Sequence, residues 1–181
     1  MKLSRIFTCL AFAACATFAF GSVAMAKLPA DMAEYNARYE KEATTPEGAA
    51  KLWLEAAFLY QDASTRALGR DIFLALMKGL PKDFERNAAH STMVDRIKNQ
   101  PEIQRSYCAG SSPENNYKAD VNNCEITVTD SKAGMDPTTW NVWLKSSGAD
   151  SPRQITLVKD GDHWKVWSAP GLYMGIRPAV K

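Results

Sequence analysis

Residues 155–167 read Ile-Thr-Leu-Val-Lys-Asp-Gly-Asp-His-Trp-Lys-Val-Trp, and this stretch decides the fold. Two runs rich in β-branched and aromatic residues flank an Asp-Gly pair, a strong signal for a two-residue hairpin turn because such turns need positive φ. With Asp160 and Gly161 as the central residues, Leu157 faces Trp164 across the hairpin. The apolar side chains then share one buried face, which comprises Ile155, Leu157, Trp164 and Val166.

Two further strands are predicted upstream, because apolar and polar residues alternate over 124–129 and again over 140–145. Turn-forming residues at 147–152 separate them from the hairpin. Trp143 and Trp167 fall on the opposite, mixed face of this meander. A solvated sheet face seldom carries so much aromatic surface, so we expect the C-terminal residues or a second copy of the chain to cover it.

Helices precede the strands. Thr45-Pro46-Glu47 is a helix start, and apolar residues then recur at helical spacing to about Gln61. A second apolar stripe covers 68–77 and ends at Gly79-Leu80-Pro81, while 82–105 is predicted to be helical with weaker patterning. Residues 27–44 fit either a short amphipathic helix or a leader. The expected fold class is α+β, with N-terminal helices packed on a curved antiparallel sheet.

This order of elements resembles the nuclear-transport-factor-2-like (NTF2-like) superfamily, in particular its secreted bacterial members without assigned function. The opening Thr-Pro-Glu-Gly-Ala-Ala-Lys-Leu-Trp-Leu at 45–54 and the hairpin at 155–167 carry the resemblance, which extends over 45–178. It implies a cone with a pocket between helices and sheet, and dimers formed through the outer sheet face. Some such proteins are isomerases or dehydratases and others only bind a ligand; no catalytic position of theirs is matched here.

The N-terminus has the three parts of a secretory signal peptide, predicted to be residues 1–26. Lys2 and Arg5 precede an uncharged run, and Ala24-Met25-Ala26 supplies the small residues of a cleavage site. Residues 45–181 are expected to form one domain after the 27–44 segment. The chain should therefore be exported, to the periplasm or the medium of a bacterium, without a membrane span in the mature form.

Charge argues against nucleic acid as a partner. Lys2 and Arg5 would leave with the signal peptide, after which basic and acidic residues number 20 each. Binding to nucleic acid depends on clustered positive charge, which a balanced chain lacks.

Cys108 and Cys124 are the two cysteines that the mature form keeps, and we expect a disulfide in an oxidising compartment. The bridge would enclose 15 residues, for a stabilisation of about 3 kcal/mol by loop closure. A zinc site would need more ligands, and redox pairs normally sit two residues apart.

Candidate functional residues are few. His90 is the strongest acid/base candidate, because imidazole titrates near neutrality, although a partly exposed histidine at a helix start is the simpler interpretation. His163, beside the hairpin turn, is expected at the surface. A buried carboxylate could come from Asp71, Glu85 or Asp95. No spacing predicts a metal, cofactor or phosphate site.

Four aromatic residues are predicted to point inward and either line a pocket for a small apolar ligand or simply pack the core: Trp53, Tyr60, Trp140 and Trp164. The leading hypothesis is an exported, non-catalytic binding or accessory module, dimeric through the face that carries Trp143 and Trp167. The alternatives are a small-molecule isomerase or hydro-lyase using His90 or a pocket carboxylate, and an envelope protein-interaction factor whose contact surface is the loop between Cys108 and Cys124.

Overall fold

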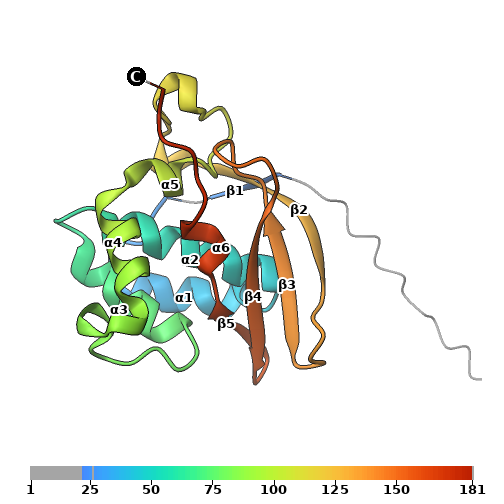
Figure 1. The fold of residues 1–181 in the computed structure, drawn as a ribbon. Coiled ribbons are helices and arrows are strands. Elements are labelled where there is room, and N and C mark those ends of the chain that lie inside the picture. Colours follow the sequence, from blue (N-terminus) through green and yellow to red (C-terminus); the bar gives the residue numbers. More distant parts are fainter. Residues whose placement is uncertain (1–21, 26, 181) are drawn as a thin grey trace, which may run out of the picture.

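The computed structural model describes residues 22–25 and 27–180, so most of the predicted signal peptide lies outside the described residues. The chain is an α+β structure in which a helical layer covers one face of an antiparallel sheet (Figure 1). The expected fold class is confirmed.

The sheet is a meander, so each strand pairs with the next along the chain. Its strands are β1 (Ser22–Ala24), β2 (Glu125–Ala133), β3 (Thr139–Leu144), β4 (Arg153–Asp160) and β5 (His163–Ser168). β1 pairs antiparallel with the outer edge of β2. Because β1 lies within the predicted signal peptide, cleavage before Lys27 would remove it and expose that edge.

The hairpin pairs as expected, but its turn is displaced by one residue. Asp160 pairs with His163, so Gly161 and Asp162 are the central residues, and Leu157 faces Val166 rather than Trp164. Only the first central position has positive φ, +66°, and glycine takes it. The shift moves cross-strand partners by two positions, which keeps every side chain on its predicted face.

Three helices follow the N-terminal segment. α1 (Met32–Glu42) shows that part of residues 27–44 is helical. α2 (Pro46–Gln61) begins as predicted, with the Thr45 hydroxyl accepting a hydrogen bond from Gly48 N at 3.1 Å. α3 (Arg66–Leu76) lies against α2, where a Cβ on Gly69 would come within 2.3 Å of Tyr60 N.

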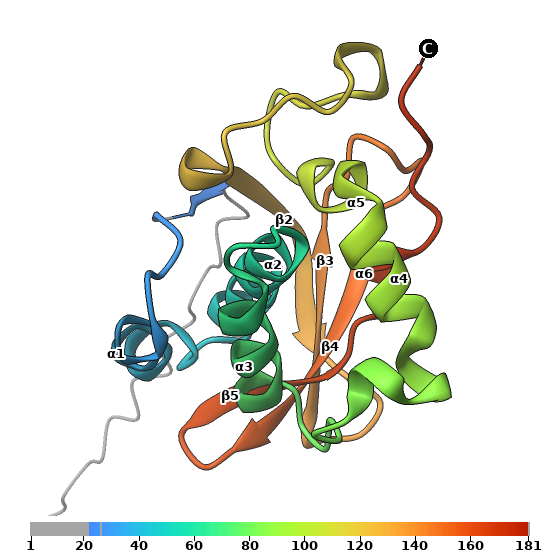
Figure 2. The same ribbon diagram turned by 90° about the vertical axis from the view of Figure 1, so that its left-hand side faces the viewer.

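The predicted helical region after α3 contains α4 (Ser91–Asn99) and α5 (Pro101–Arg105), preceded by the 3₁₀ turns Phe84–Arg86 and Ala88–His90. Two more 3₁₀ turns, Pro113–Asn115 and Val121–Asn123, lie in the loop before β2. After β5, α6 (Pro170–Tyr173) returns to the helical side. Figure 2 shows α6 between α4 and β4.

The predicted disulfide joins Cys108 to Cys124, with a Cα–Cα distance of 5.0 Å. The loop that it closes is anchored by Tyr117, which is fully buried and donates a hydrogen bond to Arg177 O at 2.7 Å. Val180 N also donates to Pro113 O, at 3.0 Å. The C-terminal residues therefore run beside the disulfide loop (Figure 1) and do not cover the outer sheet face.

The space between α2 and the sheet is solid core. The side chains that fill it from the sheet are fully buried: Val142, Leu144, Ile155, Leu157 and Val166. On the outer face, Trp143 is half-buried beneath the Lys132 ammonium, 4.6 Å from its ring centroid, whereas Trp167 is 59% exposed. The mixed character predicted for this face is confirmed by these two environments.

Candidate functional site

Among the described residues, the predicted carboxylates Glu85 and Asp95 are paired with side chains other than His90. His90 ends a 3₁₀ turn at the start of α4 and is half-buried. Glu85 accepts hydrogen bonds from Tyr60 Oη at 2.7 Å and from Arg70 Nε at 3.1 Å. Asp95 is on α4, where Asn99 Nδ2 donates to it at 2.7 Å. These carboxylates already have partners outside any described cavity, so the His90 mechanism stays a prediction.

His163, expected at the surface, has a side chain that is 21% exposed and partly covered by α1. Its ring stacks on Tyr39 of α1, with centroids 5.2 Å apart, and its Nε2 lies 3.3 Å from Glu40 Oε2. Trp164 N donates to Ala43 O at 2.7 Å beside it. The end of the β4–β5 hairpin therefore packs against the C-terminal turn of α1. Residue spacing in the sequence does not predict this contact.

The four aromatic residues predicted for a ligand pocket occupy two places. Trp53 and Tyr60 are fully buried in α2 and pack against Phe73, with ring centroids 5.5 and 5.7 Å away. The rings of Trp140 on β3 and Trp164 on β5 lie edge to face, with their centroids 6.0 Å apart. None of the four lines the cavities described below. Their part in ligand binding stays a prediction.

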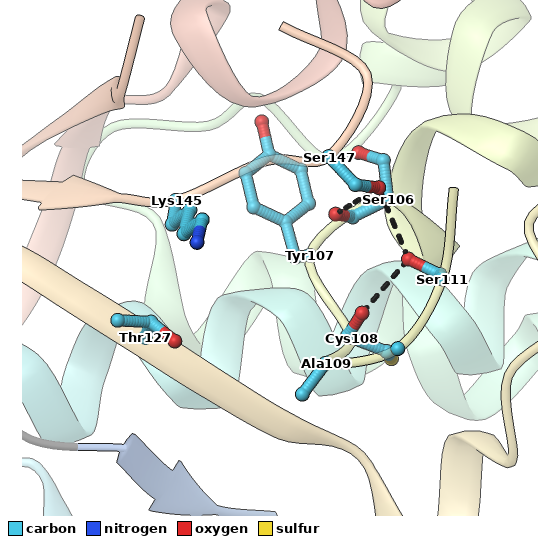
Figure 3. A pocket seen from close by; sticks show the side chains of 9 residues that line it. Ser106, Tyr107, Cys108, Ala109, Ser111, Thr127, Lys145 and Ser147 are labelled. Atoms are coloured by element: carbon cyan, nitrogen blue, oxygen red, sulfur yellow. Dashed lines mark hydrogen bonds between the residues drawn. The ribbon is translucent and has the colours of Figure 1, made fainter. Parts of the chain in front are cut away.

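A small polar pocket of about 210 Å³ lies beside the disulfide. In Figure 3, Ser106, Ser111 and Ser147 gather on one side of it, and Lys145 and Thr127 lie on the other. A lysine near several serines could form either a catalytic nucleophile or an anion-binding site. Which of these is possible depends on whether the serine hydroxyls are already hydrogen-bonded.

The serine hydroxyls of this pocket donate their hydrogen bonds to other atoms of the protein. Ser106 Oγ donates to Ile103 O at 2.7 Å, and Ser111 Oγ donates to Cys108 O at 2.8 Å. Ser147 Oγ lies 3.1 Å from both Ser106 O and Ser111 Oγ. Each hydroxyl has one proton, so these three serine hydroxyls have none left to donate to a bound anion. The network fastens the disulfide loop to the β3–β4 loop.

Charged side chains are buried where α1 meets α2. Glu55 on α2 is 1% exposed and accepts a hydrogen bond from Arg38 Nη2 of α1 at 2.6 Å. Arg38 Nε also donates to Glu42 Oε1 at 3.0 Å, and Lys51 Nζ lies 2.8 Å from Glu42 Oε2. Such a network is favourable only when each charge has a partner, because burial removes its hydration.

Burial dominates the ionisation of Glu55. Desolvation raises the pKa of its carboxyl to about 7, against the lowering influence of Arg38 and Lys51. Its Oε2 and the nearby Tyr35 Oη are buried without a hydrogen-bond partner among the described residues. A perturbed carboxyl is a common mark of a functional site, yet Glu55 lines none of the described cavities. Its evident role is to join two helices.

The largest described cavity, about 540 Å³, opens between the segment before α1, the C-terminal end of α2 and the start of α5. Its apolar lining residues are Leu28, Pro29, Ala30, Phe58, Leu59, Pro101 and Val121, and its polar lining residues are Lys27, Gln61, Asp62, Thr65, Arg105 and Asn122. A cavity of this volume, with mostly apolar walls and a few polar groups, is typical of small-molecule sites.

Polar groups in this cavity differ in their freedom to bind a ligand. Asp62 Oδ1 accepts hydrogen bonds from Ser64 N at 2.8 Å and Ser64 Oγ at 2.7 Å. Thr65 Oγ1 donates to Leu59 O at 2.7 Å. Arg105 Nε, by contrast, is buried and has no hydrogen-bond partner in the described part of the chain.

The ionic network extends to this cavity. Arg38 Nη1 donates to Lys27 O at 3.1 Å, so the arginine that pairs with Glu55 also holds the segment that forms one cavity wall. Neither Arg38 nor Glu55 was predicted from the sequence as a functional or buried residue. Charges within a helical pattern are usually solvated, and only the packing of α1 on α2 makes them buried.

No group of three or more His, Cys, Asp or Glu side chains is arranged to hold a metal ion among residues 22–25 and 27–180. Within the same residues, no helix has the length and apolar character that crossing a bilayer requires. The disulfide is consistent with an oxidising compartment.

Comparison with known proteins gives one result. No curated protein and no solved structure matches the chain. A family model described as "Domain of unknown function (DUF6935)" matches residues 27–180. On that match, which spans the helices, the disulfide and strands β2–β5, the chain belongs to the DUF6935 family.

Proposed function

We propose that this protein is an exported, non-catalytic binding module that takes a small, largely apolar molecule into the cavity between Lys27–Ala30, α2 and α5. The observation that carries the proposal is the cavity itself, about 540 Å³ with a mostly apolar wall. Glu85 and Asp95 are paired with side chains other than His90, which favours binding over the isomerase or hydro-lyase alternative.

Export is supported by three observations. The N-terminal residues follow the pattern of a signal peptide, the chain contains a disulfide, and the family match begins at residue 27, the predicted first residue of the mature form. Mass spectrometry of the product from a bacterium that expresses the whole chain tests this. A mature protein that begins at Lys27 is expected, and one that retains residues 1–26 contradicts export by cleavage.

The NTF2-like resemblance is part of the proposal. The order of the elements supports it, since helices α2 and α3 precede an antiparallel meander. The pocket that such domains carry between helices and sheet is here occupied by Leu144, Ile155 and other core side chains. We therefore propose the cavity at the N-terminal segment, rather than the centre of the cone, as the binding site.

Dimerisation through the outer sheet face also belongs to the proposal. Trp167 is 59% exposed, and the C-terminal residues run elsewhere. Sedimentation of the purified protein at high concentration should show a dimer that Trp167→Ser weakens. A protein that stays monomeric contradicts this part without affecting ligand binding.

Binding is tested with the neutral fluorophore N-phenylnaphthylamine, whose emission rises in apolar surroundings. We expect saturable binding of one molecule per chain. Val121→Trp should fill the cavity and abolish the signal, whereas Ala67→Trp, on the exposed side of α3, should leave it unchanged. Absence of saturable binding, or equal binding by both variants, refutes the proposed site.

A further inference from the structure

We propose that the ligand of this cavity is an amphipathic anion, with its apolar body against Phe58 and Leu59 and its carboxylate or sulfonate group on Arg105. The inference rests on the proposed binding function and adds the chemical class of the ligand. It follows from the distribution of apolar surface, charge and free hydrogen-bond donors around the cavity.

Two of the apolar lining residues belong to the core. Phe58 and Leu59, in the last turns of α2, are 4% and 3% exposed. Leu28 and Val121 pack against the same core from the N-terminal segment and the disulfide loop. A hydrocarbon or aromatic body placed here would lose contact with water without displacing polar partners.

The charged residues of the lining carry excess positive charge. Lys27 and Arg105 are its bases, and Asp62 is the single acid among the lining residues. Asp62 is exposed, and Ser64 already donates two hydrogen bonds to it. Cleavage before Lys27 would add an α-ammonium to the same wall. The cavity should therefore prefer an anion to a cation or a neutral molecule of similar shape.

Arg105 is the group that an anion would contact. Its side chain lines the cavity, and its buried Nε has no hydrogen-bond partner in the described residues, so no carboxylate or carbonyl already holds the guanidinium at that atom. A planar guanidinium matches the geometry of a carboxylate or sulfonate. In the serine pocket beside the disulfide, by contrast, the hydroxyls of Ser106 and Ser111 already donate to backbone carbonyls.

The test compares two fluorophores that share an apolar body. Anilinonaphthalene sulfonate carries an anionic group, and N-phenylnaphthylamine lacks it. With protein produced from the full chain, we expect the sulfonate to bind more tightly than the neutral probe. Arg105→Gln should weaken sulfonate binding about ten-fold, the usual effect of losing a charge-assisted hydrogen bond, and should change the neutral probe less than two-fold.

Two controls separate charge from folding. Arg86→Gln removes an exposed arginine outside the cavity and should bind both probes like the wild type. Arg105→Lys keeps the charge but not the planar donors, so its sulfonate affinity should fall between wild type and Arg105→Gln. Near-ultraviolet circular dichroism of the tryptophans shows that each variant is folded.

The outcomes are distinguishable. A selective loss of sulfonate binding in Arg105→Gln supports the anion site. Equal sulfonate affinity in Arg105→Gln and Arg86→Gln, with normal binding of the neutral probe, overturns the ligand class and leaves the binding function standing. Failure of the neutral probe to bind the wild-type protein overturns the proposed function itself.

Discussion

Helix α2 contacts two of its neighbouring helices, α1 and α3, in physically different ways. Toward α3 it presents Trp53 and Tyr60, and Gly69 of α3 approaches the α2 backbone closely. Toward α1 it presents Glu55 and Lys51, which are buried among opposite charges. The α3 contact is apolar and should be insensitive to pH. The α1 contact depends on ionisation, and it also holds the wall of the cavity.

This difference has a consequence for stability. Apolar packing contributes in proportion to the surface removed from water, whatever the protonation of the chain. A buried ion pair contributes little beyond its own desolvation cost, but the loss of one partner leaves the other charge buried alone. The two sides of α2 should therefore respond differently to substitution and to pH.

The largest effect is expected from Trp53→Ala. It removes a fully buried indole that packs against Phe73 and Tyr173, so the free energy of unfolding should fall by about 3–5 kcal/mol. Urea denaturation measures this. Met135→Ala, at an exposed methionine between β2 and β3, is the control and should change stability by less than about 0.5 kcal/mol. Equal losses in the two variants would contradict the position of Trp53 in the core.

Arg38→Ala should destabilise the chain by about 3 kcal/mol at pH 8, because it removes the arginine that pairs with the buried Glu55 and with the partly exposed Glu42. The loss should be smaller at pH 5.5, where Glu55 is protonated and needs no counter-charge. Denaturation at the two pH values tests this, with Arg86→Ala as the exposed control. A loss independent of pH would show that the network does not depend on Glu55 ionisation.

Gly69→Ala tests the apolar side. A Cβ there would lie 2.3 Å from Tyr60 N and 2.7 Å from Tyr60 Cα, so α2 and α3 must separate. We expect a loss of about 1–3 kcal/mol, constant between pH 5 and 8. Ala67→Ser, on the exposed side of α3, should stay within about 0.5 kcal/mol of the wild type.

Glu55→Gln should change the pH dependence of stability. The pKa of Glu55 is raised to about 7 in the folded chain from its ordinary 4.5, so the folded state binds this proton more tightly than the unfolded state. Stability from this group is therefore greatest below pH 4.5 and declines as pH rises through 7. The decline should amount to about 1–3 kcal/mol between pH 5 and 8.

Denaturation curves measured every half unit of pH make the comparison. The Glu55→Gln variant should lose this component of the slope, whereas Glu125→Gln, an exposed carboxyl on β2, should keep it. Superimposable slopes for Glu55→Gln and the wild type would mean that the ionisation of Glu55 is not coupled to folding.

Much of the fold could be predicted, because its signals are local. Thr45-Pro46 starts α2 through its own cap, and the alternation after Cys124 requires strands. The turn was misplaced by one residue, since Asp-Gly does not say which position takes positive φ. In the folded chain Asp160 ends β4 and pairs with Lys78 at 2.8 Å and Lys165 at 3.1 Å, long-range partners that a local pattern omits.

The candidate site could not be predicted. Its walls come from segments separated by about a hundred positions, and Arg105 shows no motif that marks it as a ligand-binding residue. Its importance comes from burial without a partner, a property of the folded chain. His90, the residue favoured by its side-chain chemistry, lines neither the serine pocket nor the large cavity.

The amino-acid sequence by itself determined the α+β class, the strand faces and the disulfide, because these depend on periodicity, capping and the pairing of two remaining cysteines. Only the tertiary structure decided that α2 is buried on both sides, that His163 packs against α1 and that a cavity lined by Arg105 is formed. Those properties depend on which surfaces meet, and the free energy of a charge or a donor is set by the neighbours that exclude water from it.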